Sequence, residues 1–283
     1  MIIDFHTHTF PDKIAAKTVH HLSTVSHSRP WTDGSISALS SSMKKAGIDY
    51  SINLPVATNV GQVEKLNQTM IRNQEDMLKS GVITLGCMHP AYENYRDQLK
   101  ILKDNGIKGI KLHPAYQEVD LDDINMMHVI DAASELDMIV LIHAGIDIGI
   151  FDHDYSSVKH ILKVIDQIHP PKFVLAHMGG WACWDDVERD LAGAPVWLDT
   201  GFAIGPIERA EGDPTPPYIP SNLSHEDFVR LCRKHGTDRI LFATDSPWAD
   251  QKDYVDRVKS MPFTDIEMEH IFSGNALELL GMR

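Results

Sequence analysis

Short apolar segments alternate with stretches of helical spacing along the whole of this 283-residue chain, and this alternation limits the fold more than any other feature. Strands that alternate with helices run parallel and are joined by right-handed crossovers. Eight such units in a chain of this length fit an α/β fold of the (β/α)8 barrel type, the TIM barrel, better than two doubly wound domains. The predicted strands are 1–8, 48–54, 82–88, 107–112, 138–142, 173–176, 196–198 and 239–243. The predicted helices lie within 11–27 and at 35–46, 60–79, 95–103, 121–136, 158–168, 184–191, 228–235, 254–261 and 265–280.

One segment interrupts the alternation. Residues 202–224 are rich in proline, glycine and acidic residues and have no periodic pattern. They follow the seventh predicted strand, so on a barrel they would overhang the C-terminal face. A surface excursion and a lid or specificity loop both fit, because long structureless loops in compact domains are often functional. No low-complexity linker divides the chain, so we predict a single domain over residues 1–283.

Polar residues of metal-binding type stand where the predicted strands end. The first strand ends in His6 and His8, and residues i and i+2 of a strand point to the same face. Two neutral imidazoles placed in this way can hold one divalent metal. In a parallel barrel the C-terminal strand ends meet at one face, where catalytic groups gather. The later strand ends carry Lys111 and His113, His143, His177, and Asp245.

Each of these residues alone could be a packed histidine or a helix-capping aspartate. Their occurrence on five strand ends of one predicted barrel favours a metal site instead. The count of 16 histidines agrees with metal chemistry.

Charge and cysteine content limit the partners and the compartment. The net charge of −14 argues against nucleic acid and anionic membrane surfaces as partners. Cys87, Cys183 and Cys232 form no C-x-x-C motif, and an odd number fits no disulfide framework, so we expect reduced thiols. We find no signal-peptide pattern and no apolar stretch long enough to span a bilayer, and therefore expect a cytoplasmic protein.

The amino-acid sequences of the strand-end motifs resemble those of the amidohydrolase superfamily. The segments D-F-H-T-H, G-I-K-L-H-P, L-I-H-A-G, L-A-H-M-G-G and L-F-A-T-D-S-P are similar to its amidohydrolase-related branch. That branch includes aminocarboxymuconate-semialdehyde decarboxylase, related aromatic-acid decarboxylases and many metal-dependent hydrolases. The resemblance covers nearly the whole chain and implies a (β/α)8 barrel with a catalytic metal.

The resemblance also implies roles for the strand-end residues. The metal ligands would be His6, His8, His143 and Asp245. Three neutral nitrogens and one carboxylate suit zinc and leave a position for water, whose pKa falls to ~7 on a metal. Asp245 would act as general base and hand the proton to the leaving group. His177 would polarise the substrate oxygen or, in a two-metal site, serve as a ligand.

Lys111 and His113 are expected to contact substrate. In binuclear members of the family a lysine at the position of Lys111 is carboxylated and bridges two metals, which would raise the metal count from one to two. Alternatively, Lys111 is a cation that binds a substrate carboxylate or pairs with a neighbouring acid. His113 lies on the same strand face.

We therefore expect a metal-dependent hydrolase that uses a metal-activated water on a small amide, ester or lactone. The alternative is a non-oxidative decarboxylase of a small aromatic or unsaturated carboxylic acid. Both classes use H-x-H, but many decarboxylases of this branch carry a glutamate in place of the first histidine. The histidine at position 6 therefore favours hydrolysis. The complete set of ligands, base and polariser argues against a non-catalytic binding protein. The expected partner is a small-molecule substrate, and a homo-oligomer remains open.

Overall fold

Parallel strands form the centre of the molecule. The computed structural model describes residues 1–210 and 222–282. The strands are β1 (Ile3–Thr7), β2 (Tyr50–Asn53), β3 (Val82–Thr84), β4 (Gly86–Cys87), β5 (Gly109–Leu112), β6 (Ile139–Ile142), β7 (Phe173–Leu175), β8 (Trp197–Asp199) and β9 (Ile240–Leu241). They form a three-stranded sheet, β1-β2-β3, and a six-stranded sheet, β4 through β9, and every neighbouring pair is parallel.

Backbone hydrogen bonds link the two sheets at both seams. The third predicted strand is divided into β3 and β4 at Leu85, whose amide still donates to the Asn53 carbonyl at 3.0 Å. At the other seam the Phe5 amide donates to the Phe242 carbonyl and the Asp245 amide to the His6 carbonyl, each at 2.8 Å. The strands therefore follow one another around a ring, and the predicted α/β fold of the (β/α)8 class is confirmed.

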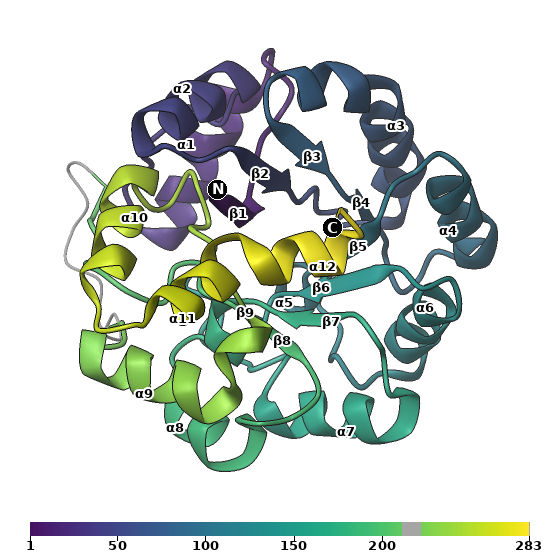
Figure 1. Ribbon diagram of the computed structural model, residues 1–283. Helices are drawn as coiled ribbons and strands as arrows, with labels where there is room; N and C mark the ends of the chain where they lie inside the picture. The colour runs from purple at the N-terminus through teal and green to yellow at the C-terminus, as the bar shows by residue number, and fades with distance from the viewer. Residues whose placement is uncertain (211–221, 283) are drawn as a thin grey trace.

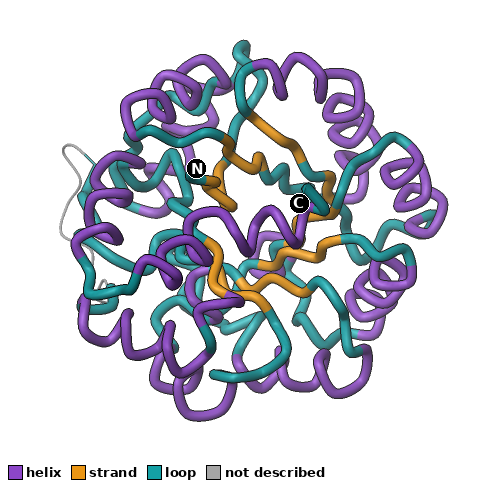
Figure 2. The backbone as a smooth tube through the Cα atoms, viewed as in Figure 1, coloured by secondary structure: helices purple, strands orange, loops and turns teal. Residues whose placement is uncertain are grey.

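Most of the helices surround this ring (Figures 1 and 2). The helices are α1 (Ala15–Ser26), α2 (Ile36–Ala46), α3 (Val63–Lys79), α4 (Tyr95–Asp104), α5 (Pro114–Gln117), α6 (Ile124–Glu135), α7 (Val158–Ile168), α8 (Trp184–Asp186), α9 (His225–His235), α10 (Gln251–Ser260), α11 (Asp265–Glu269) and α12 (Asn275–Leu280). The short α5 was not predicted; Pro114 begins it and the His113 side chain caps it. The helix predicted over 265–280 is divided by a π-helical turn at His270–Gly274.

The apolar core has two parts. One fills the space between the strands and the surrounding helices. The other lies inside the ring of strands, where Phe5, Ile52 and Leu141 pack together with Leu279 and Leu280 of α12. Figure 1 shows α12 lying across the centre of the ring. The helix therefore closes the N-terminal end of the barrel, and the opposite end is left for the strand-end residues.

The loop predicted over 202–224 is described only at its two ends. Residues 211–221 lie outside the described part, so the lid role stays a prediction. At the described ends, Phe202 and Ile204 are buried, and Glu208 forms an ion pair with Arg29 at 2.7 Å. Among the helices of residues 1–210 and 222–282, none has the length and apolar character needed to cross a membrane.

Candidate active site

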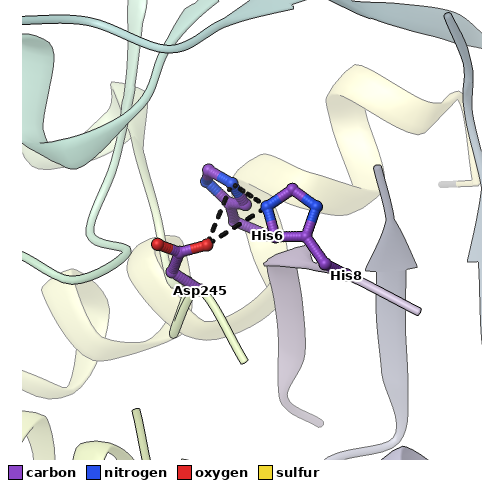
Figure 3. Close-up of side chains that lie close together, drawn as sticks. All are labelled: His6, His8 and Asp245. Atoms are coloured by element: carbon purple, nitrogen blue, oxygen red, sulfur yellow. Dashed lines mark hydrogen bonds and ion pairs between the residues drawn. The ribbon is translucent and has the colours of Figure 1, made fainter. Parts of the chain in front are cut away.

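Three hydrogen-bond acceptors converge at the C-terminal end of β1. His6 and His8 approach each other with their Nε2 atoms 3.1 Å apart. Asp245, just beyond β9, brings Oδ1 to 3.4 Å from His6 Nε2 and 3.2 Å from His8 Nε2 (Figure 3). The β1–β2 register shifts between Asp4 and Thr7. Such irregularities re-aim side chains near active sites, and here the shift includes His6 and precedes His8.

The other ring nitrogens show where the protons lie. His6 Nδ1 is 2.8 Å from Asp199 Oδ2, and His8 Nδ1 is 2.8 Å from the Leu54 carbonyl oxygen. Both partners are acceptors, so each Nδ1 carries the hydrogen and each neutral ring has its lone pair on Nε2. Burial, with Lys111 nearby, lowers the pKa of His6 well below its usual value, which keeps this ring neutral.

Two lone pairs and a carboxylate oxygen therefore face one another. This arrangement repels unless a cation lies among the three atoms. Ligands about 2.1 Å from a tetrahedral ion lie roughly 3.4 Å apart, which matches the observed separations of 3.1, 3.2 and 3.4 Å. The three residues thus fit a divalent metal, and they are among the predicted ligands.

His177 and His143 lie beside this cluster. His177 Nδ1 is 2.7 Å from the Gly201 carbonyl, and His177 Nε2 is 3.0 Å from His143 Nδ1. Asp199 connects His177 to His6, because its second oxygen accepts from the His177 backbone amide at 3.0 Å. The structure thus places the fourth predicted ligand, His143, next to His177 rather than within the group of three.

The backbone is strained at two of these residues. His177 and Asp245 have φ values of 58° and 64°, in the left-handed region that residues other than glycine rarely adopt. Such strain gathers at active sites, where the surrounding structure holds it for the position of a side chain.

Lys111 and His113 lie in the same buried region. Lys111 is 1% exposed, and its Nζ has no hydrogen-bond partner among residues 1–210 and 222–282. Burial lowers its pKa to about 8, although Asp199, Asp245 and Asp147 attract the charged form. His113 stacks on His143, with ring centroids 4.3 Å apart.

Two aspartates were missed by the sequence analysis. Asp199 is the last residue of β8, and its position at a strand end is a signal that could have identified it. Asp147 follows β6 in a loop, has Oδ2 at 3.6 Å from His113 Nε2, and offered no comparable signal. Burial raises the pKa of Asp147 to about 6.

Comparison with known proteins agrees with the fold. The model of the family described as Amidohydrolase matches residues 3–282. No curated protein matches the chain.

Solved structures share the architecture over the whole length. An uncharacterized TIM-barrel protein from Bordetella bronchiseptica is similar with a TM-score of 0.73 and 18% identity, covering 99% of this chain and 98% of that one. A dihydroxybenzoic acid decarboxylase from Polaromonas sp. JS666, with bound manganese and 2-nitroresorcinol, has a TM-score of 0.70 and 14% identity, covering 99% and 97%. The probable 2-pyrone-4,6-dicarboxylic acid hydrolase from Acinetobacter baumannii, with citric acid bound, has a TM-score of 0.64 and 15% identity, covering 99% of each chain.

Proposed function

Because this chain belongs to the amidohydrolase family, whose model spans residues 3–282, we propose that it is a metal-dependent hydrolase of a small amide, ester or lactone. The observation that carries the proposal is the group of three acceptors formed by His6, His8 and Asp245. A purely structural cluster of this kind would need a donor hydrogen among the three atoms, and their other hydrogen bonds leave none.

We assign the metal to His6, His8 and Asp245, with His143 as the fourth ligand. Bound there, a divalent ion would supply Lewis acidity and lower the pKa of a water to ~7. A set of three nitrogens and one carboxylate favours zinc. Manganese is the alternative, since the similar Polaromonas decarboxylase holds it.

Asp245 and His177 would handle the protons. Asp245 accepts the proton of the attacking water and delivers it to the leaving group. His177 has its Nδ1 hydrogen on the Gly201 carbonyl, so its neutral ring offers Nε2 as an acceptor. Polarising a substrate oxygen would require the imidazolium form. Burial lowers the pKa of His177, which disfavours that protonated form. A role as base or second-metal ligand needs no extra proton.

Lys111 indicates a substrate that carries a carboxylate. Its buried Nζ has no hydrogen-bond partner within residues 1–210 and 222–282, and a buried cation is stabilised when an anion pairs with it. The anion would be a substrate carboxylate. In the binuclear alternative, carboxylation would convert the free amine of Lys111 into an anionic carbamate and so remove the buried cation. His113, stacked against His143, would line the same side of the substrate.

The same lysine supports a second candidate, non-oxidative decarboxylation of a small aromatic or unsaturated acid. That reaction also needs a carboxylate held beside the metal. The likeness to a dihydroxybenzoic acid decarboxylase favours this alternative, and the histidine at position 6 favours hydrolysis.

The first experiment is elemental analysis of protein purified without chelator, with mass spectrometry of the peptide that contains Lys111. Two metals per chain and a carboxylated lysine would favour a binuclear hydrolase. One metal and an unmodified lysine would make decarboxylation an equal candidate. Assays on lactone acids and hydroxybenzoates, read as proton release and as CO2 release, then separate the reactions.

Asp245→Asn should lower turnover by roughly 10²–10⁴-fold, the range expected for loss of a general base. Circular dichroism should stay unchanged, because Asn keeps the size of the side chain. Full activity in a metal-free Asp245→Asn protein would contradict the assigned site.

A further inference from the structure

Asp147 is a buried carboxylate for which the proposed reaction has no role. It lies in the loop after β6 and is 4% exposed. Its Oδ1 accepts from the Gly149 amide at 2.8 Å. Its Oδ2 faces two imidazoles, at 3.6 Å from His113 Nε2 and 3.9 Å from His143 Nε2. The carboxylate is therefore fixed on one side and aimed at two site histidines on the other.

The loop that carries Asp147 is anchored at the α1 side of the barrel. Gly149 lies against Val25 of α1, and a Cβ at this glycine would be 2.9 Å from Val25 Cγ1. Because α1 follows β1 and Gly149 follows β6, the loop reaches from one strand end toward another that is distant in the ring. This contact and the Gly149 hydrogen bond hold the carboxylate in place.

The proton of His113 faces Asp147. His113 Nδ1 accepts from the Tyr116 amide at 3.3 Å and thereby caps α5. A neutral imidazole with an acceptor at Nδ1 carries its hydrogen on Nε2. His113 Nε2 thus has no lone pair for a metal, so His113, His143 and Asp147 do not form a second metal site in this state.

The two neutral tautomers of His143 present different groups to Asp147: one turns the Nε2 lone pair toward the carboxylate, and the other turns the Nε2–H toward it. With the hydrogen on Nδ1, the ring would bond to His177 Nε2 and turn the Nε2 lone pair toward the carboxylate. With the hydrogen on Nε2, the ring points a donor at Asp147 and leaves the Nδ1 lone pair beside that of His177. His143 Nε2 is buried and has no hydrogen-bond partner in the described ranges, so Asp147 is the nearby acceptor that can select the second tautomer.

We propose that Asp147 is a positioning residue that holds His143 with its hydrogen on Nε2 and so directs Nδ1 to the metal. Metal-binding histidines generally donate their other N–H to a carboxylate or carbonyl, which fixes ring and tautomer. Asp199 already has this relation to His6 at 2.8 Å. The inference rests on the proposed function, in which His143 is a ligand.

Asp147→Asn tests this with little change of shape. The Gly149 amide still needs an acceptor, so the new side chain would turn its oxygen to Gly149 and its NH2 group to the histidines. A donor would then face His143 Nε2 and move the ring hydrogen to Nδ1. We expect the Kd for Zn²⁺, from competition with a chelator, to rise about 10–100-fold.

Asp154→Asn is the matched control. Asp154 lies in the same loop and accepts from the Ser156 amide at 3.2 Å, as Asp147 does from Gly149, but its other carboxylate oxygen faces Cys183 Sγ at 3.8 Å and not an assigned ligand. Its Kd for Zn²⁺ should stay within about twofold of wild type, because the Asp154 carboxylate does not orient a metal-binding histidine. Thermal unfolding of both metal-free variants checks that the fold is kept.

Nitrogen-15 NMR of the histidine rings supplies a readout that needs no activity. Without metal, His177 Nε2 at 3.0 Å competes for a hydrogen on His143 Nδ1, so the Zn²⁺-loaded protein is the one to measure. Zn²⁺-loaded wild type should show His143 bound through Nδ1 with its hydrogen on Nε2. His143 with its hydrogen on Nδ1 in Zn²⁺-loaded wild type would overturn the proposal, even if the variant does not fold.

His143→Ala separates this proposal from the proposed function. Zn²⁺ binding as tight as wild type in that variant would reject His143 as a ligand. Weaker binding in His143→Ala, together with unchanged binding in Asp147→Asn, would reject the role of Asp147 alone. Loss of one whole ion from a two-ion protein in Asp147→Asn would make Asp147 a ligand and also overturn the positioning role.

Discussion

The ammonium group of Lys111 is buried inside the barrel, and its charge lowers the free energy of unfolding. An unpaired buried cation loses hydration without recovering it in a contact. Burial lowers its pKa from 10.5 to about 8, so most of the group is still protonated at pH 7. The difference corresponds to about 3 kcal/mol of destabilisation relative to the unfolded chain.

Lys111→Met should therefore raise the free energy of unfolding of the metal-free protein by up to about 3 kcal/mol at pH 7. Between the folded pKa of about 8 and the unfolded value of 10.5, the unfolded wild type binds more protons, so wild-type stability rises with pH. The advantage of the variant should shrink over that window. Denaturant unfolding at pH 7 and pH 9.5 measures both effects, and turnover should be lost.

Lys79→Met is the control for this substitution. Lys79 is exposed on α3 and pairs with Asp76. An exposed pair contributes little, so the free energy of unfolding should be nearly unchanged at both pH values. An advantage of Lys111→Met that is equal at the two pH values would contradict a charge effect.

The sequence predicted the residues that end strands better than those that support them. His6, His8 and Asp245 could be found because strand ends of a parallel barrel meet at one face. Asp199 has the same placement but lies one residue beyond the predicted strand 196–198, whereas β8 includes it. Asp147 could not be found, since its position depends on a loop path set by a contact with α1.

At the scale of elements, Asp4 joins the first strand to the last strand and to α10. Its carboxylate accepts from the Thr244 amide at 3.0 Å, the Thr244 hydroxyl at 2.5 Å, Gln251 Nε2 at 2.8 Å and the His6 amide at 3.2 Å. Thr244 follows β9 and Gln251 begins α10. A single buried side chain on β1 thus satisfies donors from β1, from the segment after β9 and from α10.

Asp4→Ala should lower the free energy of unfolding by roughly 2–5 kcal/mol, because it leaves buried amide donors without an acceptor. Denaturant titration followed by far-UV circular dichroism measures the loss. Asp76→Ala, on the exposed face of α3, is the matched control and should leave the free energy of unfolding nearly unchanged. An equally small change in Asp4→Ala would mean that water replaces the lost acceptor.

Most element types followed from the sequence, and the breaks within them did not. The apolar run over 82–88 predicts one strand, but the Thr84 hydroxyl donates to the Leu85 carbonyl at 2.9 Å and takes this group from the sheet. Asn67 of α3 then pairs with both the amide and the carbonyl of Cys87 at 2.9 Å. Local side-chain bonds of this kind compete with the sheet ladder and are not visible in hydrophobic spacing.

For the whole molecule, the two ends of the barrel have different tasks. Polar groups gather at the C-terminal end, and α12 fills the N-terminal end with Leu279 and Leu280 against the interior of the strands. Because the strands form one ring linked at both seams, disturbance at the closed end should reach the site at the open end. The predicted single domain over 1–283 can be tested through this coupling.

Leu279→Ala should lower the free energy of unfolding by about 2–5 kcal/mol, since Leu279 is 4% exposed and the truncation leaves a cavity inside the ring. In a single cooperative unit, far-UV circular dichroism and tryptophan fluorescence should report one coincident transition in wild type and in the variant. Trp197 lies against the interior cluster and Trp181 near the open end, so fluorescence samples both ends. Two separate transitions, with only one moved by Leu279→Ala, would divide the chain into independent units and contradict the single-domain prediction.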